Sequence, residues 1–269
     1  TPVPYDAHIH FDRYEPHEQE SMLKRAAAMG LKGLVTVSMD RSSCEANLRL
    51  ARQYPGLVLP AFGHHPEQPP LSDEELEALC GWIEALPSDL NFAIGEVGLP
   101  YFNRTAAEAE GRAFDSEPYL RQCERFIRLA ARLGRPINLH AVHEDADTVM
   151  DMLERCGVEK AHFHWFKGSK KTRERLIRNR CSISLTPEVL YDEETRELAR
   201  EFPLELLLVE TDGPWPFEGP YTGRRTEPGM VMDSIREIAR LKGLPERQVS
   251  DAIAENIRRF YGFEMPAGG

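Results

Sequence analysis

Residues 5–10 read Tyr-Asp-Ala-His-Ile-His ("YDAHIH") and place three titratable side chains in what otherwise reads as an opening strand. In an extended segment side chains alternate between two faces, so Asp6, His8 and His10 share one face. Two imidazoles therefore point at one place. An isolated His-x-His pair is equally consistent with buried, hydrogen-bonded histidines and with metal ligands, so the pair alone does not decide its own role.

Beyond this strand, short apolar runs alternate with longer amphipathic segments along the whole chain. The apolar runs predict eight strands, at residues 5–9, 33–38, 57–62, 92–97, 137–141, 161–165, 182–186 and 205–211. Helices are predicted after start signals at Ser72 and Ser116, and at residues 17–29, 42–53, 144–156, 169–179, 192–201, 230–242 and 246–260. This alternation predicts a closed parallel (β/α)8 TIM barrel, with an open doubly wound sheet as the alternative.

The chain of 269 residues shows no repeat, low-complexity tract or linker, so we expect a single domain over residues 1–269. No apolar run is long enough to span a bilayer and no signal-peptide pattern is present, so neither membrane contact nor secretion is expected. Five scattered cysteines without a Cys-x-x-Cys pair suit the reducing cytoplasm. A net charge of −11 argues against a surface-wide electrostatic grip on nucleic acid, but not against a local basic patch or metal ions.

The histidines gather at the ends of the predicted strands. Of nine histidines, all except His17 lie within or just after a strand: His8, His10, His64, His65, His140, His143, His162 and His164. Glu96 closes the fourth strand and Asp212 the eighth, and an acid there is costly to bury unless it is paired or binds a cation. Taken singly, these acids are also consistent with an ion pair and a helix cap. Together with the histidines they converge on one end of one barrel, the end where catalytic loops lie.

Imidazole and carboxylate ligands with open positions suit zinc, manganese or iron, and magnesium is a further candidate. Six such ligands suffice for two ions. A carboxylate that bridges two divalent cations lets them lie about 3.5–4 Å apart and activate one water between them. The residue set therefore indicates hydrolytic chemistry.

The sequence resembles the TatD family of metal-dependent hydrolases over nearly the whole chain. The resemblance rests on motifs in order: "DAHIH", "GHHPE", "AIGEVGL", "PINLHAVHEDA", "HFHWFKGS" and "VETDGPW". It implies one metal held by His8, His10, Glu96 and Asp212, and a second held by Glu96, His140 and His164. Glu96 would be the bridge, His65 would lie beside the reacting group, and Asp6 would orient a ligand or a backbone group.

The resemblance also implies a metal-dependent deoxyribonuclease, commonly a 3'-5' exonuclease. The expected substrate is therefore DNA, single-stranded or at 3' ends, or a small phosphodiester. Asp212 is expected to orient or accept the proton of the attacking water, and His65, or alternatively His143, to contact the phosphate or leaving group. The chain departs from common family motifs at Pro100, Val142, His143, Trp165 and Lys167. The metal ligands are thus intact while substrate contacts are altered.

Three further groups of residues are each consistent with two roles. Residues 167–180 hold seven basic residues against the single acid Glu174, which suits phosphate steering or a solvated helix face. Aromatic residues near the motifs suit base stacking or loop packing; they are Trp165, Phe166, Trp215, Phe217 and Tyr221. Arg224 and Arg225 suit phosphate contacts or ordinary surface charge.

Two other functions compete with the nuclease. A metallohydrolase of a small ester, lactone or amide would use the same centre, because such a centre polarises carbonyl as well as phosphoryl groups, and the acidic net charge favours it. A non-catalytic module that keeps metal only for stability is the other, and six intact ligand positions argue against it.

Overall fold

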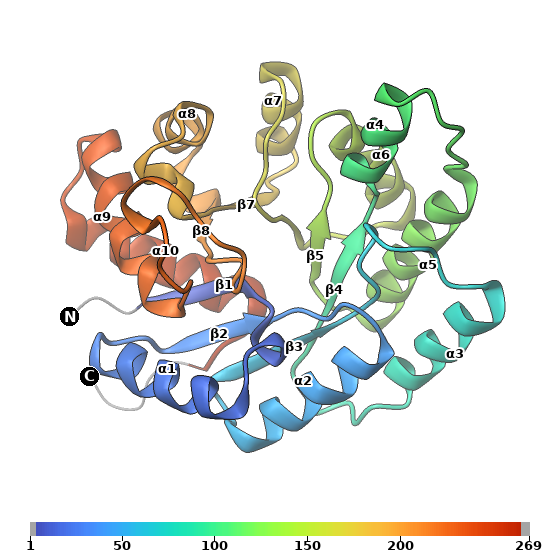
Figure 1. Ribbon diagram of the computed structural model, residues 1–269, viewed down its shortest axis with the longest axis horizontal. Helices are drawn as coiled ribbons and strands as arrows, with labels where there is room; N and C mark the ends of the chain where they lie inside the picture. The colour runs from blue at the N-terminus through green and yellow to red at the C-terminus, as the bar shows by residue number, and fades with distance from the viewer. Residues whose placement is uncertain (1–3, 265–269) are drawn as a thin grey trace.

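The computed structural model describes residues 4–264 and confirms the parallel (β/α)8 barrel (Figure 1). Eight parallel strands hydrogen-bond to their neighbours in chain order. They are β1 Tyr5–Ile9, β2 Gly33–Thr36, β3 Val58–Phe62, β4 Ala93–Gly98, β5 Ile137–His140, β6 Ala161–Phe163, β7 Ser182–Leu185 and β8 Leu207–Val209. Each lies within three residues of its predicted bounds, because an apolar run between turn residues is a strong local signal.

The segment that follows β8 returns to β1 and closes the barrel. The backbone amide of Asp212 donates to the carbonyl of His8 (2.9 Å), and the amide of His10 donates to the carbonyl of Gly213 (2.8 Å). The buried Asp6 carboxylate fastens the same seam: it accepts hydrogen bonds from the Thr211 amide (3.1 Å) and hydroxyl (2.6 Å). Asp6 therefore orients backbone at this seam, beside two of the predicted ligands.

The helices surround the strands (Figure 1). They are α1 Pro16–Ala28, α2 Arg41–Gln53, α3 Asp73–Glu84, α4 Tyr101–Ala109, α5 Glu117–Leu133, α6 Glu144–Cys156, α7 Lys170–Arg178, α8 Glu193–Glu201, α9 Val231–Lys242 and α10 Glu246–Tyr261. At the start of α3 the Ser72 hydroxyl accepts from the Glu75 amide (3.1 Å), as the start signal predicted. None of the helices within residues 4–264 is long and apolar enough to cross a bilayer.

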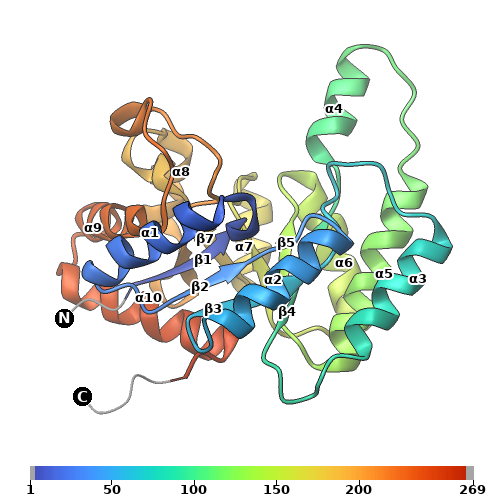
Figure 2. The same cartoon turned by 60° about the horizontal axis from the view of Figure 1, so that its bottom comes forward.

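Helix α4 was not predicted. Its only buried residue is Ala107, so it shows no apolar stripe of the kind that identifies a helix in a sequence. Figure 2 shows α4 standing out from the barrel beyond the ends of β4 and β5. Its first turn is held by the Glu67 carboxylate, which accepts from the amides of Phe102 (2.9 Å) and Asn103 (3.0 Å).

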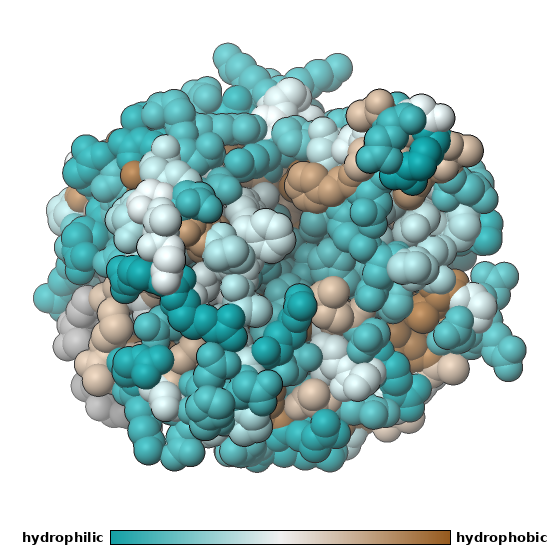
Figure 3. Space-filling model, viewed as in Figure 1, coloured by the Kyte–Doolittle hydropathy of each residue, from teal (hydrophilic) through white to brown (hydrophobic). Residues whose placement is uncertain are grey.

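The main apolar core lies between the strands and the surrounding helices, where residues such as Leu34, Ile94, Phe126 and Ile183 are fully buried. The outer face seen in Figure 3 is mostly hydrophilic, with separate small hydrophobic patches. All five cysteines are free thiols. Inside the barrel, by contrast, many buried side chains are polar, and these polar side chains form the site described next.

Candidate metal centre

The six predicted ligands come from five strands or the segments directly after them, and the structure brings them together at the carboxyl end of the barrel. They are His8, His10, Glu96, His140, His164 and Asp212, and all are buried. Parallel strands place their carboxyl ends on one face, which is why residues up to 204 positions apart in sequence meet. His65 joins them from the segment after β3.

One oxygen of the Glu96 carboxylate faces the histidines of β1. Glu96 Oε1 lies 3.2 Å from Nε2 of His8 and 3.2 Å from Nε2 of His10. Asp212 Oδ1 faces the same two nitrogens, at 3.1 Å from His8 and 3.3 Å from His10. These four residues are the set that the family resemblance implied for one metal.

The other oxygen of Glu96 faces a different group of imidazoles. Glu96 Oε2 lies 2.8 Å from Nε2 of His164, 3.2 Å from Nε2 of His65 and 3.4 Å from Nδ1 of His140. The rings of His8 and His164 stack with centroids 3.6 Å apart, so the two groups are contiguous. A single carboxylate thus addresses two neighbouring clusters of nitrogen donors.

Several of these atoms are buried without any hydrogen-bond partner: Nε2 of His8 and His164, both carboxylate oxygens of Glu96, and Oδ1 of Asp212. Leaving buried polar atoms unpaired is costly, and a divalent cation bound among them would remove that cost. Nitrogen and oxygen donors of this kind suit zinc and manganese. The donor set therefore fits a metal centre.

The mutual attraction of these groups shifts their pKa values. Burial opposes ionisation of Glu96, yet the imidazoles of His65 and His164 hold its pKa well below the ordinary range. Burial likewise disfavours the His10 cation, but the adjacent carboxylates of Asp212 and Glu96 raise its pKa to about 9. The pKa of His140 is also raised to about 9, because the hydrogen bond with Glu67 and the nearby Glu96 carboxylate outweigh burial. Without metal, the positive charge of the protonated imidazoles balances the negative charge of the carboxylates.

Backbone geometry near the centre is unusual for residues other than glycine. Asp212 (φ 50°), His143 (φ 54°) and Trp165 (φ 43°) all have left-handed backbone conformations. Such conformations cost energy and occur most often where function requires a particular side-chain direction. His143, the alternative substrate contact, packs its ring 4.8 Å from the ring of Tyr101, at the start of α4.

Three partners of the predicted ligand imidazoles were missed in the sequence. Glu210 Oε1 lies 3.1 Å from Nδ1 of His164, and Asn138 Oδ1 lies 2.8 Å from Nδ1 of His8. Glu67 Oε2 lies 3.2 Å from Nε2 of His140. An acceptor on one ring nitrogen fixes the proton there, which leaves the lone pair of the other nitrogen facing Glu96.

A signal for two of these partners was present. Glu210 precedes Asp212 by two residues, and Asn138 precedes His140 by two. Because side chains on a strand repeat every two residues, each lies on the same inward face one layer deeper in the barrel. Glu67 has no such relation to His140, since it reaches the centre from the loop after β3.

The Glu210 contact gives a first prediction. Replacing Glu210 with glutamine keeps the size of the side chain but removes the charge that holds the His164 proton, so metal affinity is expected to fall by about 10- to 100-fold. Titration with Mn²⁺ measures this. Glu188→Gln, in a carboxylate that instead pairs with Lys167 (3.0 Å), is the matched control and should keep wild-type affinity. Equal affinities in the two variants would contradict the orienting role.

Three of the seven basic residues in 167–180 form ion pairs in the structure. Lys167 pairs with Glu188, Arg173 with Glu201 (3.0 Å), and Arg175 with Asp151 (2.6 Å) among other acids. The acids come from α6, from the 3-10 helix Pro187–Leu190 (η2) and from α8, so the sequence of α7 alone does not reveal these pairs. The other four basic residues of the run are exposed: Lys170, Lys171, Arg178 and Arg180. In the loop after β8, Arg225 pairs with Glu18 (3.2 Å).

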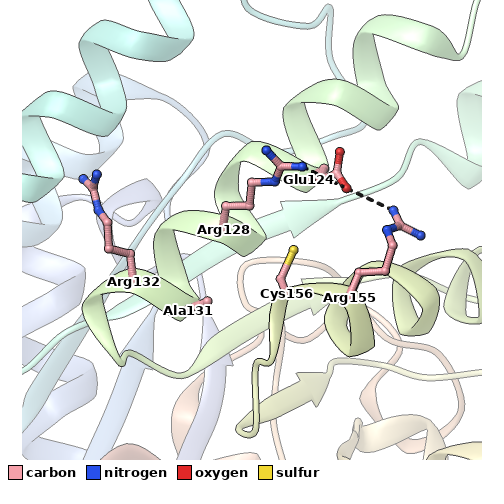
Figure 4. A pocket seen from close by; sticks show the side chains of 6 residues that line it. All are labelled: Glu124, Arg128, Ala131, Arg132, Arg155 and Cys156. Carbon is pink, nitrogen blue, oxygen red and sulfur yellow. Dashed lines mark hydrogen bonds and ion pairs between the residues drawn. The ribbon is translucent and has the colours of Figure 1, made fainter.

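A surface cavity of about 550 Å³ lies elsewhere, between α5 and α6 (Figure 4). It is lined by Glu124, Arg128, Ala131, Arg132, Arg155 and Cys156. Glu124 pairs with Arg155 (3.0 Å) and lies 3.7 Å from Arg128, and Arg132 pairs with Glu84 outside the lining. Because α6 ends here, the cavity is at the opposite end of the barrel from the histidine cluster.

Comparisons with known proteins agree with this centre. Residues 5–262 match the family model described as TatD related DNase. A Haemophilus influenzae protein named "Uncharacterized metal-dependent hydrolase" is 34% identical, with 96% of this chain and 98% of that protein covered. Human "Deoxyribonuclease TATDN3" is 30% identical, with 95% and 93% covered. The crystal structure of YJJV, a TATD homolog from Escherichia coli, superposes with a TM-score of 0.80 at 26% identity, with 98% of each chain covered. The chain therefore belongs to the TatD family of metal-dependent hydrolases.

Proposed function

We propose that this protein is a phosphodiesterase acting on DNA ends, a deoxyribonuclease of the 3'-5' exonuclease type with two divalent metal ions. The observation that carries the proposal is the position of Glu96, whose two carboxylate oxygens face two separate groups of imidazoles. One ion would be held by His8, His10, Glu96 and Asp212, and the other by Glu96, His140 and His164. The deoxyribonuclease name of the human relative supports DNA as substrate.

Divalent ions, when bound at such a centre, make a water molecule nucleophilic near neutral pH and stabilise the negative charge that develops on the phosphoryl oxygens. Asp212 would accept the proton of that water. Burial opposes ionisation of Asp212, but the adjacent imidazoles of His10 and His8 hold its pKa below the ordinary range, so the carboxylate is ionised at neutral pH. It therefore has a free oxygen lone pair to accept a proton.

His65 has a different protonation pattern from the four ligand histidines. The backbone amide of Glu67 donates to Nδ1 of His65 (3.0 Å), and burial lowers the pKa of His65 despite the nearby Glu96. The neutral ring then carries its proton on Nε2, the nitrogen that faces the centre. This assignment suits a hydrogen-bond donor to a phosphate oxygen better than a metal ligand.

A metallohydrolase of a small ester, lactone or amide is the second candidate. The net charge of −11 and the internal ion pairs of the basic run favour it over a polynucleotide substrate. A location in the cytoplasm stays a prediction from the cysteine pattern.

The test is metal analysis of the purified protein, followed by digestion of end-labelled single-stranded DNA with and without added Mg²⁺ or Mn²⁺. We expect about two bound ions per chain and stepwise loss of nucleotides from the 3' end, abolished by a chelator and restored by metal. Turnover of a small ester, lactone or amide without any cleavage of DNA would favour the second candidate and reject the first.

Metal binding should release protons. At pH 7 the raised pKa of His10 and of His140, each about 9, keeps both rings protonated in the metal-free protein, and a ligand imidazole must give up that proton. For each proton released per ion, Mn²⁺ affinity is expected to rise about tenfold per pH unit from pH 6 to 8 and to level off above pH 9. Calorimetric titrations across this range measure it, with His17→Ala, in the exposed face of α1, as control. Affinity independent of pH would contradict the ligand assignment.

A further inference from the structure

Two aromatic rings stand exposed beside the metal centre. Within residues 4–264, the large hydrophobic side chains that remain exposed are Met29 (49%), Phe102 (56%) and Trp215 (57%). Met29 lies at the end of α1, on the outside of the barrel. The other two follow β4 and β8 and flank the cluster of histidines and acids.

Phe102 is fixed against the side of the centre that faces Oε2 of Glu96. Its ring centroid lies 5.8 Å from that of His140, and its backbone amide donates to the same Glu67 oxygen that contacts His140 Nε2. The carboxylate of Glu67 thus holds the first turn of α4 and the imidazole together. The ring of Phe102 borders the centre and is open to solvent.

Trp215 is fixed on the side that faces Oε1. Its amide donates to the carbonyl of Asp212 (3.0 Å), and its carbonyl accepts from the Thr226 hydroxyl (2.5 Å). The edge of its ring meets Trp165 at a centroid distance of 5.9 Å. Trp165 follows His164 directly, and its amide donates to Glu210 (2.9 Å). Trp215 therefore packs against Trp165, and both residues are hydrogen-bonded to groups of the centre or next to it.

The remaining aromatics of this region have a packing role. Phe166, Phe217 and Tyr221 are buried, and the hydroxyl of Tyr221 donates to Asp233 (2.7 Å). They leave no face free for a ligand. Phe102 and Trp215 differ because more than half of each side chain is exposed, and they border the centre at different points, one beside His140 and the other beside Asp212.

We propose that Phe102 and Trp215 are two stacking platforms for a DNA strand. Each would stack on one of the two bases that flank the phosphodiester bound at the metal centre. The proposal rests on the proposed nuclease function and names how its substrate is recognised. Flat rings stack on any base, so recognition would not depend on sequence. In a duplex the bases are paired and stacked on each other, so platforms on both sides of one phosphate select an unpaired strand or a frayed end.

The experiment compares Phe102→Ala and Trp215→Ala with Met29→Ala, which removes an exposed hydrophobic side chain far from the centre. Substrates are a single-stranded oligonucleotide and the same oligonucleotide with abasic nucleotides on both sides of the cleaved bond. Each platform variant should raise KM for the normal strand by about 5- to 100-fold, with kcat within about twofold and KM for the abasic strand nearly unchanged. Met29→Ala should match wild type on both substrates.

A second readout does not depend on turnover. With the Asp212→Asn background and Mn²⁺, a strand carrying 2-aminopurine at the platform position should lose fluorescence on binding, because stacking quenches this base. Phe102→Ala and Trp215→Ala should remove the quench, whereas Phe102→Tyr and Trp215→Phe should retain it. A purely structural role of the rings would not give this pattern.

The outcomes separate the two proposals. If wild type cleaves DNA and the alanine variants lose the same factor on normal and abasic strands, or lose nothing, the platforms are rejected and the nuclease stands. If wild type neither cleaves nor binds the oligonucleotide, the nuclease assignment fails and the platforms fail with it.

Discussion

Replacing Glu96 with alanine is expected to lower kcat/KM on a phosphodiester by more than about 10³-fold, because even one lost electrostatic contact to a transition state costs 10²- to 10³-fold. The loss should exceed that of a single ligand for a structural reason. Glu96 Oε1 faces His8 and His10 while Oε2 faces His140, His164 and His65, so one substitution would take a ligand from both ions. Bound metal should fall towards zero together with activity.

The measurement pairs metal analysis with steady-state kinetics. Glu237→Ala is the matched control, because Glu237 is a partly buried glutamate that pairs with Arg196 (2.8 Å) on the outer ring of helices. It should keep both metal and activity. Unfolding curves for both variants show that the barrel is intact. Near wild-type turnover in Glu96→Ala, or retention of both ions, would reject a shared carboxylate.

Asp212→Asn should give the second large effect, a fall in kcat of about 10²- to 10⁴-fold, the range for losing a general base. The amide has the same shape as the carboxylate that lies 3.1 Å from His8 Nε2, but it cannot take up a proton at neutral pH. Bound metal should fall by no more than one ion per chain, since the group around Oε2 of Glu96 stays complete.

This separation of metal content from rate distinguishes the two acids. Glu96→Ala should lose metal and rate together, whereas Asp212→Asn should lose rate while at least one ion per chain is retained. Activity is measured at saturating Mn²⁺, so that a lower metal affinity is not mistaken for a lower kcat. A kcat within fivefold of wild type would show that another group accepts the proton.

The strands and the gathering of ligands at one rim could be predicted because both depend on local patterns. Apolar runs mark the strands, and a parallel barrel sends every strand's carboxyl end to the same face. The layer below was harder to predict. Asp6, Asn138, His162 and Glu210 each lie two residues before a predicted ligand, so their inward direction follows from the sequence, but their partners depend on the register between strands.

His162 shows why direction alone does not assign a role. It points inward like His164, yet its ring nitrogens lie 2.6 Å from the Tyr261 and Ser184 hydroxyls. Burial lowers its pKa well below the ordinary value, so the ring is neutral. It is a hydrogen-bonded residue of the barrel interior, the alternative that a His-x-His pair leaves open. Only the depth of each residue in the barrel separates the two histidines.

Contacts between distant segments account for what the sequence could not give. Phe102 lies beside His140 because it belongs to α4, which has no apolar stripe, and because its amide donates to Glu67 in another loop. The basic residues of α7 found acids on neighbouring helices, and that pairing leaves fewer of them free for phosphate. In each case the partner is set by packing across the barrel and not by spacing along the chain.

Glu96 is proposed to join two metal ions in one centre. A crystal structure of the protein grown with Mn²⁺, with anomalous scattering used to locate the ions, tests this. Two peaks are expected in contact with Glu96, one beside His8, His10 and Asp212 and one beside His140 and His164. A single peak, or ions that do not touch Glu96, would rule out the shared carboxylate.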